Sequence, residues 1–425
     1  MLVPVIGLAT APILTHSLGV AGRGEAGAAM APNLFIVGAA TLGLPAALTY
    51  YLAKRPHLAR VALGWATLFA VAFGAVTLGV VHLTSGYLAA GSPQLAQLMV
   101  LGAWLALPAL VVGIFRGAAM GRQMWTEVAL ERVVNSMLRL VLLGVLALLG
   151  ELDVMSAVLV MSIGPVIAGL VYVRAGSRVG PPDDEPLPPS PQRIVPQLLA
   201  FGSQVWLGSV ATMLLARSSQ LLVTPLSDVE QLGLLLVAIT ISDVPYIITQ
   251  TLREFTFGVN SAQADVERLL AMSRITTLVA LAGSSVIGAT LPLWIDIVFG
   301  SGFADAIVPT WLLLASSCLT VPGMIAGAGL DSVGRPGLRS ASLVLALVGN
   351  LIGLVLLVPP WGAVGAALAA LAGTLLSTIF AVAVAARSLP APTHRFVVPQ
   401  ASDLALVRST VAALGRRLRP TGSTR

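Results

Sequence analysis

Long apolar runs separated by short polar segments dominate the chain from its first residues to about residue 386. A helix needs about 20 apolar residues to cross the hydrocarbon core of a bilayer. On that basis we predict twelve membrane-spanning helices, at residues 1–15, 30–53, 60–83, 93–115, 133–150, 154–174, 197–224, 231–252, 276–299, 306–329, 340–358 and 362–386. The pattern therefore predicts an all-α polytopic membrane protein.

The longest polar interruption lies in the middle of the chain. It contains the sequence PPDDEPLPP at 181–189, and such a proline- and acid-rich stretch is typical of a linker. Because it separates six predicted spans from six others, we expect two six-helix lobes, at 1–175 and 197–387, joined by a cytoplasmic linker at 176–196.

Three further segments show helical amphipathic patterns. Residues 118–132 and 261–274 are predicted to form elbow helices on the cytoplasmic surface. The polar tail at 388–425 contains apolar residues spaced three and four apart, with arginines off that stripe. This pattern predicts a short basic helix lying on the inner leaflet.

Composition supports the membrane interpretation. Hydrophobic residues make up 57% of the 425 residues and charged residues only 10%, whereas a soluble domain has about 25% charged residues. A net charge of +6 could indicate nucleic acid binding in a soluble protein, but in a membrane protein basic residues mark cytoplasmic loops. With the N-terminus placed inside, nearly all basic residues fall in inside segments, and Arg23 is the only one in an outside loop. We expect a multi-pass protein of a bacterial plasma membrane with both termini cytoplasmic, in contact with membrane lipids and with no nucleic acid partner.

No catalytic signature is present. The sequence lacks H-E-x-x-H, G-x-S-x-G and P-loop motifs, its four histidines have no ligand spacing, and Cys318 is its only cysteine. We therefore predict no enzyme activity, no metal and no cofactor. Residues 22–27 do match the dinucleotide pattern G-x-G-x-x-G. That pattern needs a preceding strand and an acid about 20 residues later, and neither is found, so the match is attributed to chance.

Charged residues inside predicted spans are the main functional candidates, because an ionised group at the bilayer centre costs roughly 2.5–3.5 kcal/mol. Arg217 lies in the seventh predicted span and Asp243 about midway through the eighth, so the two can form a pair. Such a pair either fixes helix packing or faces an aqueous cavity. In the second case Arg217 binds an anionic headgroup and Asp243 carries a coupling cation or proton, and both interpretations stay open.

Weaker candidates are Arg139, Asn33 and Gln204. Arg139 lies about six residues into the fifth predicted span, and we favour snorkelling to the cytoplasmic interface. Asn33 and Gln204 are expected to form interhelical hydrogen bonds more readily than substrate contacts. They are still the better candidates among the uncharged polar residues, because they lie where the two lobes should face one another.

Several short motifs occur along the chain in a characteristic order. They are LTHSLGVAGRG at 14–24, GLPAA at 43–47, FGSGF at 299–303, GRP at 334–336 and WGAVGAA at 361–367. In order and spacing they resemble the polysaccharide-biosynthesis flippases of the multidrug/oligosaccharidyl-lipid/polysaccharide exporter superfamily. The resemblance extends over nearly the whole chain.

The resemblance implies two six-helix lobes around a central cavity that opens alternately to each side. It also implies a substrate such as an undecaprenyl-diphosphate-linked oligosaccharide, flipped from the inner to the outer leaflet without ATP, and glycan-assembly enzymes as partners. A cationic cavity would suit the diphosphate, which fits Arg217 and, at the outer mouth, Arg23. His16 stands where the family usually has arginine, and Ser219 where the seventh span often has aspartate. The coupling ion, H+ or Na+, therefore stays open.

Three other functions remain as alternatives. A multidrug–cation antiporter of the same superfamily would favour acidic cavity residues, of which only Asp243 is a candidate. A membrane-embedded glycosyltransferase is disfavoured by the short outside loops. A non-transporting scaffold of cell-envelope assembly is compatible with the sequence.

Overall fold

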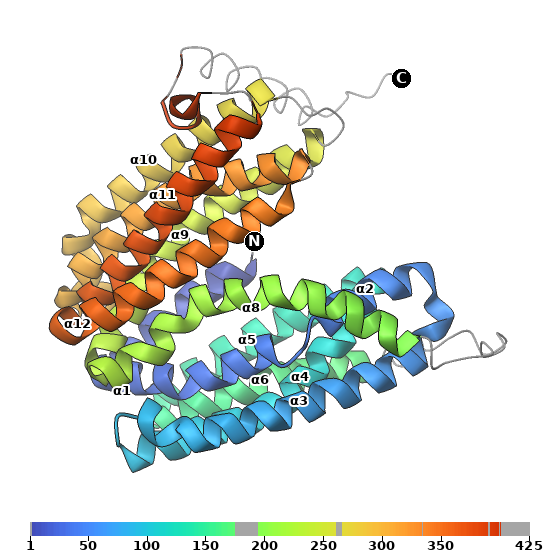
Figure 1. Cartoon of the computed structure of the whole chain (residues 1–425). Coiled ribbons are helices and arrows are strands. Elements are labelled where there is room, and N and C mark those ends of the chain that lie inside the picture. The colour runs from blue at the N-terminus through green and yellow to red at the C-terminus, as the bar shows by residue number, and fades with distance from the viewer. Residues whose placement is uncertain are drawn as a thin grey trace, which may run out of the picture. The chain divides into compact units, whose positions relative to one another are not determined.

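The structure, a computed structural model, describes residues 2–174, 194–260, 266–333, 335–389, 392–398 and 400. All regular structure in these residues is helical, which confirms the all-α prediction (Figure 1). The α-helices are α1 (Leu2–Ala39), α2 (Leu44–Lys54), α3 (Ala59–Leu88), α4 (Pro93–Gly121), α5 (Trp125–Leu149), α6 (Val154–Arg174), α8 (Ile194–Leu226), α9 (Val229–Asn260), α10 (Val266–Phe299), α11 (Ile307–Ser332) and α12 (Pro336–Ser388). Three short 3-10 helices accompany them, η1 (Pro56–Leu58), η3 (Ala304–Ala306) and η4 (Thr393–Phe396).

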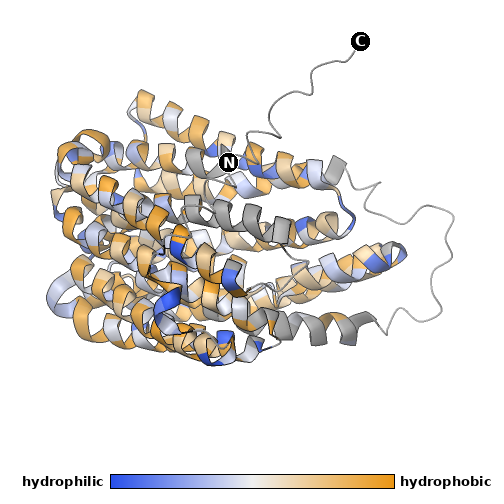
Figure 2. Ribbon diagram, turned by 90° about the horizontal axis from the view of Figure 1, so that it is seen from above, coloured by the Kyte–Doolittle hydropathy of each residue, from blue (hydrophilic) through white to orange (hydrophobic). Residues whose placement is uncertain are grey.

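Most of these helices can cross a membrane. Among the described residues, eight stretches are long and apolar enough by length and composition. Two of the eight, Ile6–Lys54 and Gly337–Ser388, contain 49 and 52 residues, about twice the length that one crossing needs. Hydrophobic residues dominate most helices along their length (Figure 2). These observations fit a protein with about twelve spans.

The two longest stretches each reverse direction at one glycine. In α1 the backbone leaves the helical region only at Gly19, with φ 67° and ψ −171°. Before it, Leu14 packs in one cluster with Leu143 and Leu152, and after it Gly22 lies against Val154. The chain therefore turns at Gly19 beside the α5–α6 connection.

This turn corrects the prediction for the first outside loop. We expected residues 16–29 to connect two spans, but one residue makes the connection, and Arg23 lies inside a helix. The G-x-G-x-x-G string at 22–27 is helical too, which agrees with a chance match. In α12 the reversal occurs at Gly362, where Gly353 packs against Ala369 of the returning arm.

The prediction of an elbow helix at 118–132 is also wrong. Residues 118–121 end α4 and 125–132 begin α5, so the amphipathic pattern belongs to the ends of two membrane helices. Of the second predicted elbow, residues 266–274 belong to α10, and 261–265 lie outside the described residues. Residues 175–193 of the linker and 401–425 of the tail, with its predicted basic helix, lie outside them as well.

Asp153 and Ser156 form a reciprocal cap at the N-terminus of α6. The Ser156 amide donates to the Asp153 carboxylate at 2.7 Å, and the Asp153 amide donates to the Ser156 hydroxyl at 2.9 Å. The hydrogen bond from the Ser156 amide, with a further one from the Ser156 side chain, lowers the pKa of the Asp153 carboxyl below its usual value. The cap therefore contributes stability above the unfolded-state pKa and loses it as the pH falls through the lower folded-state pKa.

A break at residues 40–43 separates α1 from α2, and α8 crosses it. The indole Nε1 of Trp206 donates to the Ala39 carbonyl oxygen at 2.6 Å, at a point where the helical ladder is interrupted. Gly43 has φ 68° and lies against the Gly202 backbone, where a Cβ would overlap the Gly202 carbonyl oxygen. The GLP motif at 43–45 therefore places a glycine, which can adopt the left-handed conformation, directly before α2. At this position the Gly202 backbone leaves no room for a side chain.

The chain forms two compact units. The first comprises residues 1–241, 290–313 and 347–370, and the second comprises 242–289, 314–346 and 371–425. This division by contacts does not test the predicted division into two six-helix lobes, which stays a prediction.

In the second unit, residues 392–398 fold back onto the helices as a strap, which we call the C-terminal strap. Phe396 is fully buried in a cluster with Leu270 of α10, Leu330 of α11 and Ala385 of α12. Polar contacts fix the backbone of the strap. The Ser273 hydroxyl donates to the Phe396 carbonyl at 2.7 Å, and the buried Arg274 guanidinium donates to the Arg395 carbonyl at 2.9 Å.

We predict that Gly43→Ala destabilises the protein. The left-handed backbone alone costs about 1–2 kcal/mol for a residue with a Cβ, and overlap with Gly202 adds to that cost. The control is Gly64→Ala, because a Cβ at Gly64 meets open space. It should stabilise α3 by about 0.5–1 kcal/mol. Thermal unfolding in detergent measures both, and equal melting temperatures would contradict the prediction.

We also predict that Phe396→Ala loosens the C-terminal strap. Truncating a fully buried phenylalanine costs about 3–5 kcal/mol, so the melting temperature should fall. Val398→Ala in the same strap is the control, since Val398 is 52% exposed and should tolerate the change. If both variants melt alike, Phe396 does not anchor the strap.

Candidate functional site

Two arginines of the first unit lie within electrostatic range of one another, and neither has an acidic partner among the described residues. Arg23 lies four residues after the turn of α1, and Arg139 lies near the middle of α5. The Arg139 Nη2 atom lies 3.5 Å from the position of a Cβ on Gly7, so this side chain reaches across to α1. This contact does not test the snorkelling that we expected for Arg139, which stays a prediction.

The electrostatic environment of Arg23 and Arg139 is unfavourable in the absence of a bound anion. The Nε atoms of Arg23 and Arg139 are both buried, and in the part of the chain that the structure describes they have no hydrogen-bond partner. The two guanidinium groups also lie within electrostatic range of one another and repel. Because a buried cation is stable only when it is paired and hydrogen-bonded, this arrangement can hold an anion that accepts from both groups.

Close helix packing surrounds Arg23. A Cβ on the neighbouring Gly24 would overlap the Val229 carbonyl oxygen at the start of α9, and a Cβ on Gly233 would overlap the Val20 carbonyl. Near the turn, His16 lies against Gly300 of the α10–η3 connection. His16 is exposed, so it lies near the Gly19 turn and separate from the buried packing of α1 on α9.

Arg217 belongs to a second polar group, on α8. Its Nη1 donates to Gln220 Oε1 at 3.1 Å, and the adjacent Ser218 donates to Asn350 Oδ1 of α12 at 2.9 Å. Asp243 is exposed on α9 and belongs to the other compact unit. The pairing of Arg217 with Asp243 therefore stays a prediction.

Asn33 forms an interhelical hydrogen bond, as we expected for an uncharged polar residue in a span. Its Nδ2 donates to the Gly102 carbonyl of α4 at 2.7 Å, and the residue is buried. Gln204 lies in α8, but its side chain is outside the described part of the structure. Neither result tests a role in substrate binding.

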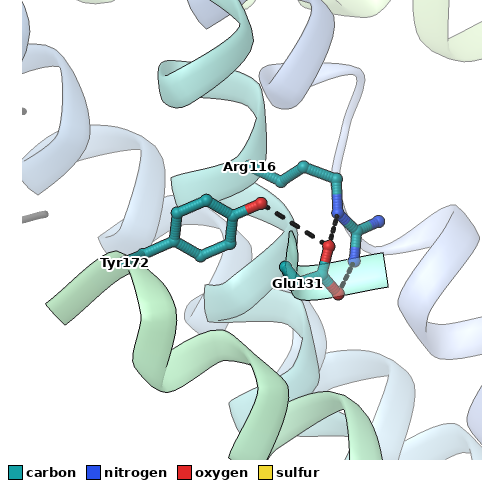
Figure 3. A network of polar contacts seen from close by, with 3 residues as sticks. All are labelled: Arg116, Glu131 and Tyr172. Carbon is teal, nitrogen blue, oxygen red and sulfur yellow. Dashed lines mark hydrogen bonds and ion pairs between the residues drawn. The ribbon is translucent and has the colours of Figure 1, made fainter. Parts of the chain in front are cut away.

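The sequence analysis missed a buried charged network at α4, α5 and α6 (Figure 3). Arg116 donates to both carboxylate oxygens of Glu131, from Nε at 2.9 Å and from Nη2 at 3.0 Å. Tyr172 donates to Glu131 at 3.5 Å, and Glu131 is only 1% exposed. The 15-residue separation of Arg116 and Glu131 crosses a helix connection, so no local spacing rule would have revealed the pair.

The long apolar helices define the class: an all-α polytopic membrane protein. The profile of the family described as "Polysaccharide biosynthesis protein" matches residues 1–253. The chain belongs to this family, which confirms the resemblance found in its sequence motifs. A search of curated proteins found no match.

Solved structures share the fold. One is the "Lipid II flippase MurJ, inward closed conformation", with a TM-score of 0.72 and 13% identity over 93% of this chain and 87% of that one. Another is the "Inward-facing conformation of a multidrug resistance MATE family transporter of the MOP superfamily", with a TM-score of 0.68 and 15% identity over 91% of this chain and 94% of that one. At such low identity these similarities establish the fold alone.

We predict that Glu131→Gln destabilises the protein while keeping the size of the side chain. The substitution removes the negative charge from two hydrogen bonds to Arg116, and hydrogen bonds to charged groups contribute about 1.5–3 kcal/mol. The control is Glu127→Gln, one turn earlier on α5 and partly exposed. Thermal unfolding should show a clear loss only for Glu131→Gln, and an equal loss in both would rule out the network as its cause.

Proposed function

We propose that this protein flips a polyprenyl-diphosphate-linked oligosaccharide, or a related cell-envelope glycolipid, from the inner to the outer leaflet of a bacterial plasma membrane. The movement is alternating access, and both termini are cytoplasmic. Family membership supports the link to polysaccharide biosynthesis. The observation that carries the proposal is the pair of partly buried arginines, Arg23 and Arg139, whose buried Nε atoms have no hydrogen-bond partner among the described residues.

The chemistry of a diphosphate suits this pair. A diphosphate presents several anionic oxygens, and a guanidinium group donates to such oxygens in a planar, two-pronged arrangement. An anion that accepts from Arg23 and Arg139 together would offset their mutual repulsion and satisfy both Nε atoms. Arg217 is proposed as a further contact for the anionic headgroup. Asp243 is proposed to carry the coupling cation, H+ or Na+.

A cation antiporter is the second candidate. A solved structure with the same fold is titled a multidrug resistance transporter, and Asp243 is an exposed carboxylate on α9. An antiporter of this kind would depend on that carboxylate and would not need the two arginines. The two functions therefore differ in the residues on which binding depends.

We predict that Arg23→Gln and Arg139→Gln each weaken binding of undecaprenyl diphosphate to the purified full-length chain. Loss of a hydrogen bond to a charged group should raise Kd roughly 10- to 100-fold. Titration in detergent measures Kd, and export of lipid-linked glycan in cells should fall in parallel. Arg387→Gln is the control, because it removes an exposed arginine at the end of α12.

The proposal fails if both arginine variants bind undecaprenyl diphosphate as tightly as the wild type. A cationic dye such as ethidium separates the two functions. Dye binding that survives both arginine substitutions and is lost in Asp243→Asn would favour the antiporter.

A further inference from the structure

A cluster of basic side chains gathers at one corner of the first unit, where α2 passes through η1 into α3. We call it the basic corner: Lys54, Arg55 and Arg60, with Arg122 at the end of α4. Helix α4 packs against α2, because Gly121 lies against the carbonyl oxygens of Leu48 and Thr49. Arg122 therefore follows a contact with the same helix that ends in Lys54.

The stretch of chain that contains this corner is free of acidic residues. Residues 26–126 contain neither aspartate nor glutamate. Lys54, Arg55 and Arg60 are all exposed, and among the described residues Arg55 and Arg60 have no acidic partner. A concentration of one sign of charge on a surface attracts ligands of the opposite sign. The ligand of the basic corner should therefore be an anion.

Exposed aromatic side chains place the corner at the membrane surface. The Lys54 Nζ lies 2.6 Å from the Tyr50 hydroxyl and 4.1 Å from the centre of its ring. Tyr50 is 42% exposed, Trp65 on α3 is 39% exposed and Trp125 at the start of α5 is 57% exposed. Tryptophan and tyrosine gather at the headgroup level of bilayers, where the ring is buried and the polar atom is hydrated.

Apolar surface continues from the basic corner along α3. Leu68 and Val76 are 56% and 60% exposed on this helix. A small soluble anion would meet only the charged groups. A phospholipid would meet both parts, with its phosphate at the corner and its acyl chains along the exposed residues of α3.

We propose that the basic corner is a binding site for the headgroup of an anionic phospholipid. Lys54, Arg55 and Arg60 bind the phosphate, and Tyr50 positions Lys54 through its hydroxyl and ring. Arg122 supplies a further positive charge. The site is distinct from the proposed glycolipid path, and it does not depend on the proposed transport activity.

The test compares two lipids with identical acyl chains, phosphatidylglycerol and phosphatidylcholine, added to the full-length chain in neutral detergent. Phosphatidylglycerol should raise the melting temperature of the wild type, and phosphatidylcholine should not. Each basic residue near a lipid surface strengthens binding by about fivefold, so the double variant Arg55→Gln/Arg60→Gln should bind phosphatidylglycerol roughly 25-fold more weakly. Binding of undecaprenyl diphosphate should be unchanged in this variant.

Labelling provides a second readout at the site itself. Lys54 is the only lysine of the chain, so an amine-reactive reagent followed by peptide mass spectrometry reports on this corner. Phosphatidylglycerol should slow labelling of Lys54 in the wild type and in the Arg387→Gln control, but not in the double variant. The proposal is overturned if the double variant keeps the full lipid effect, if Arg387→Gln loses it equally, or if inorganic phosphate reproduces it.

Discussion

The hydrocarbon core of a bilayer offers no hydrogen-bond partner, and the architecture of this chain follows from that constraint. Every backbone group inside the membrane must be satisfied by the protein, which restricts the described spans to helices. Where a helix is interrupted, another group completes the missing bond. At the α1–α2 break, the Trp206 indole donates to the Ala39 carbonyl. The break is therefore tolerated because α8 is packed against it.

Small residues make this packing possible. Lipid and side chains are similarly apolar, so membrane helices associate through close van der Waals contact more than through a hydrophobic driving force. A Cβ on Gly117 would meet the backbone of Pro45, and one on Gly24 would overlap the Val229 carbonyl. The 42 glycines thus include several at which two backbones touch. The same contacts bring α1 and α9 together beside Arg23.

Hydropathy predicted the spans well because it depends on summed composition over a window, and the observed helices contain most of the predicted ranges. It could not locate the α1 turn, since a window cannot distinguish a 14-residue loop from one glycine with a positive φ. The 118–132 pattern was misplaced for a related reason. Its buried side chains, Val128 and Glu131, face other membrane helices. Phe396, a single aromatic residue in a polar tail, gave no periodic signal at all.

The candidate site was only partly predictable. Arg23 and Arg139 could be singled out by charge, but the contact of Arg139 with α1 depends on how two distant helices pack.

The arginines of the helices divide by how their charge is satisfied. Arg116 donates to the Glu131 carboxylate, and Arg274 donates to a backbone carbonyl of the C-terminal strap. These partners are built into the chain, so a role in packing accounts for both. Arg23 and Arg139 differ, because each has a buried Nε without a partner and each lies in the field of the other. For stability alone, an apolar side chain at either position would be at least as favourable. Packing therefore gives no reason for placing two cations together, whereas binding of an anionic group does, and the proposed diphosphate would supply a negative charge to both arginines.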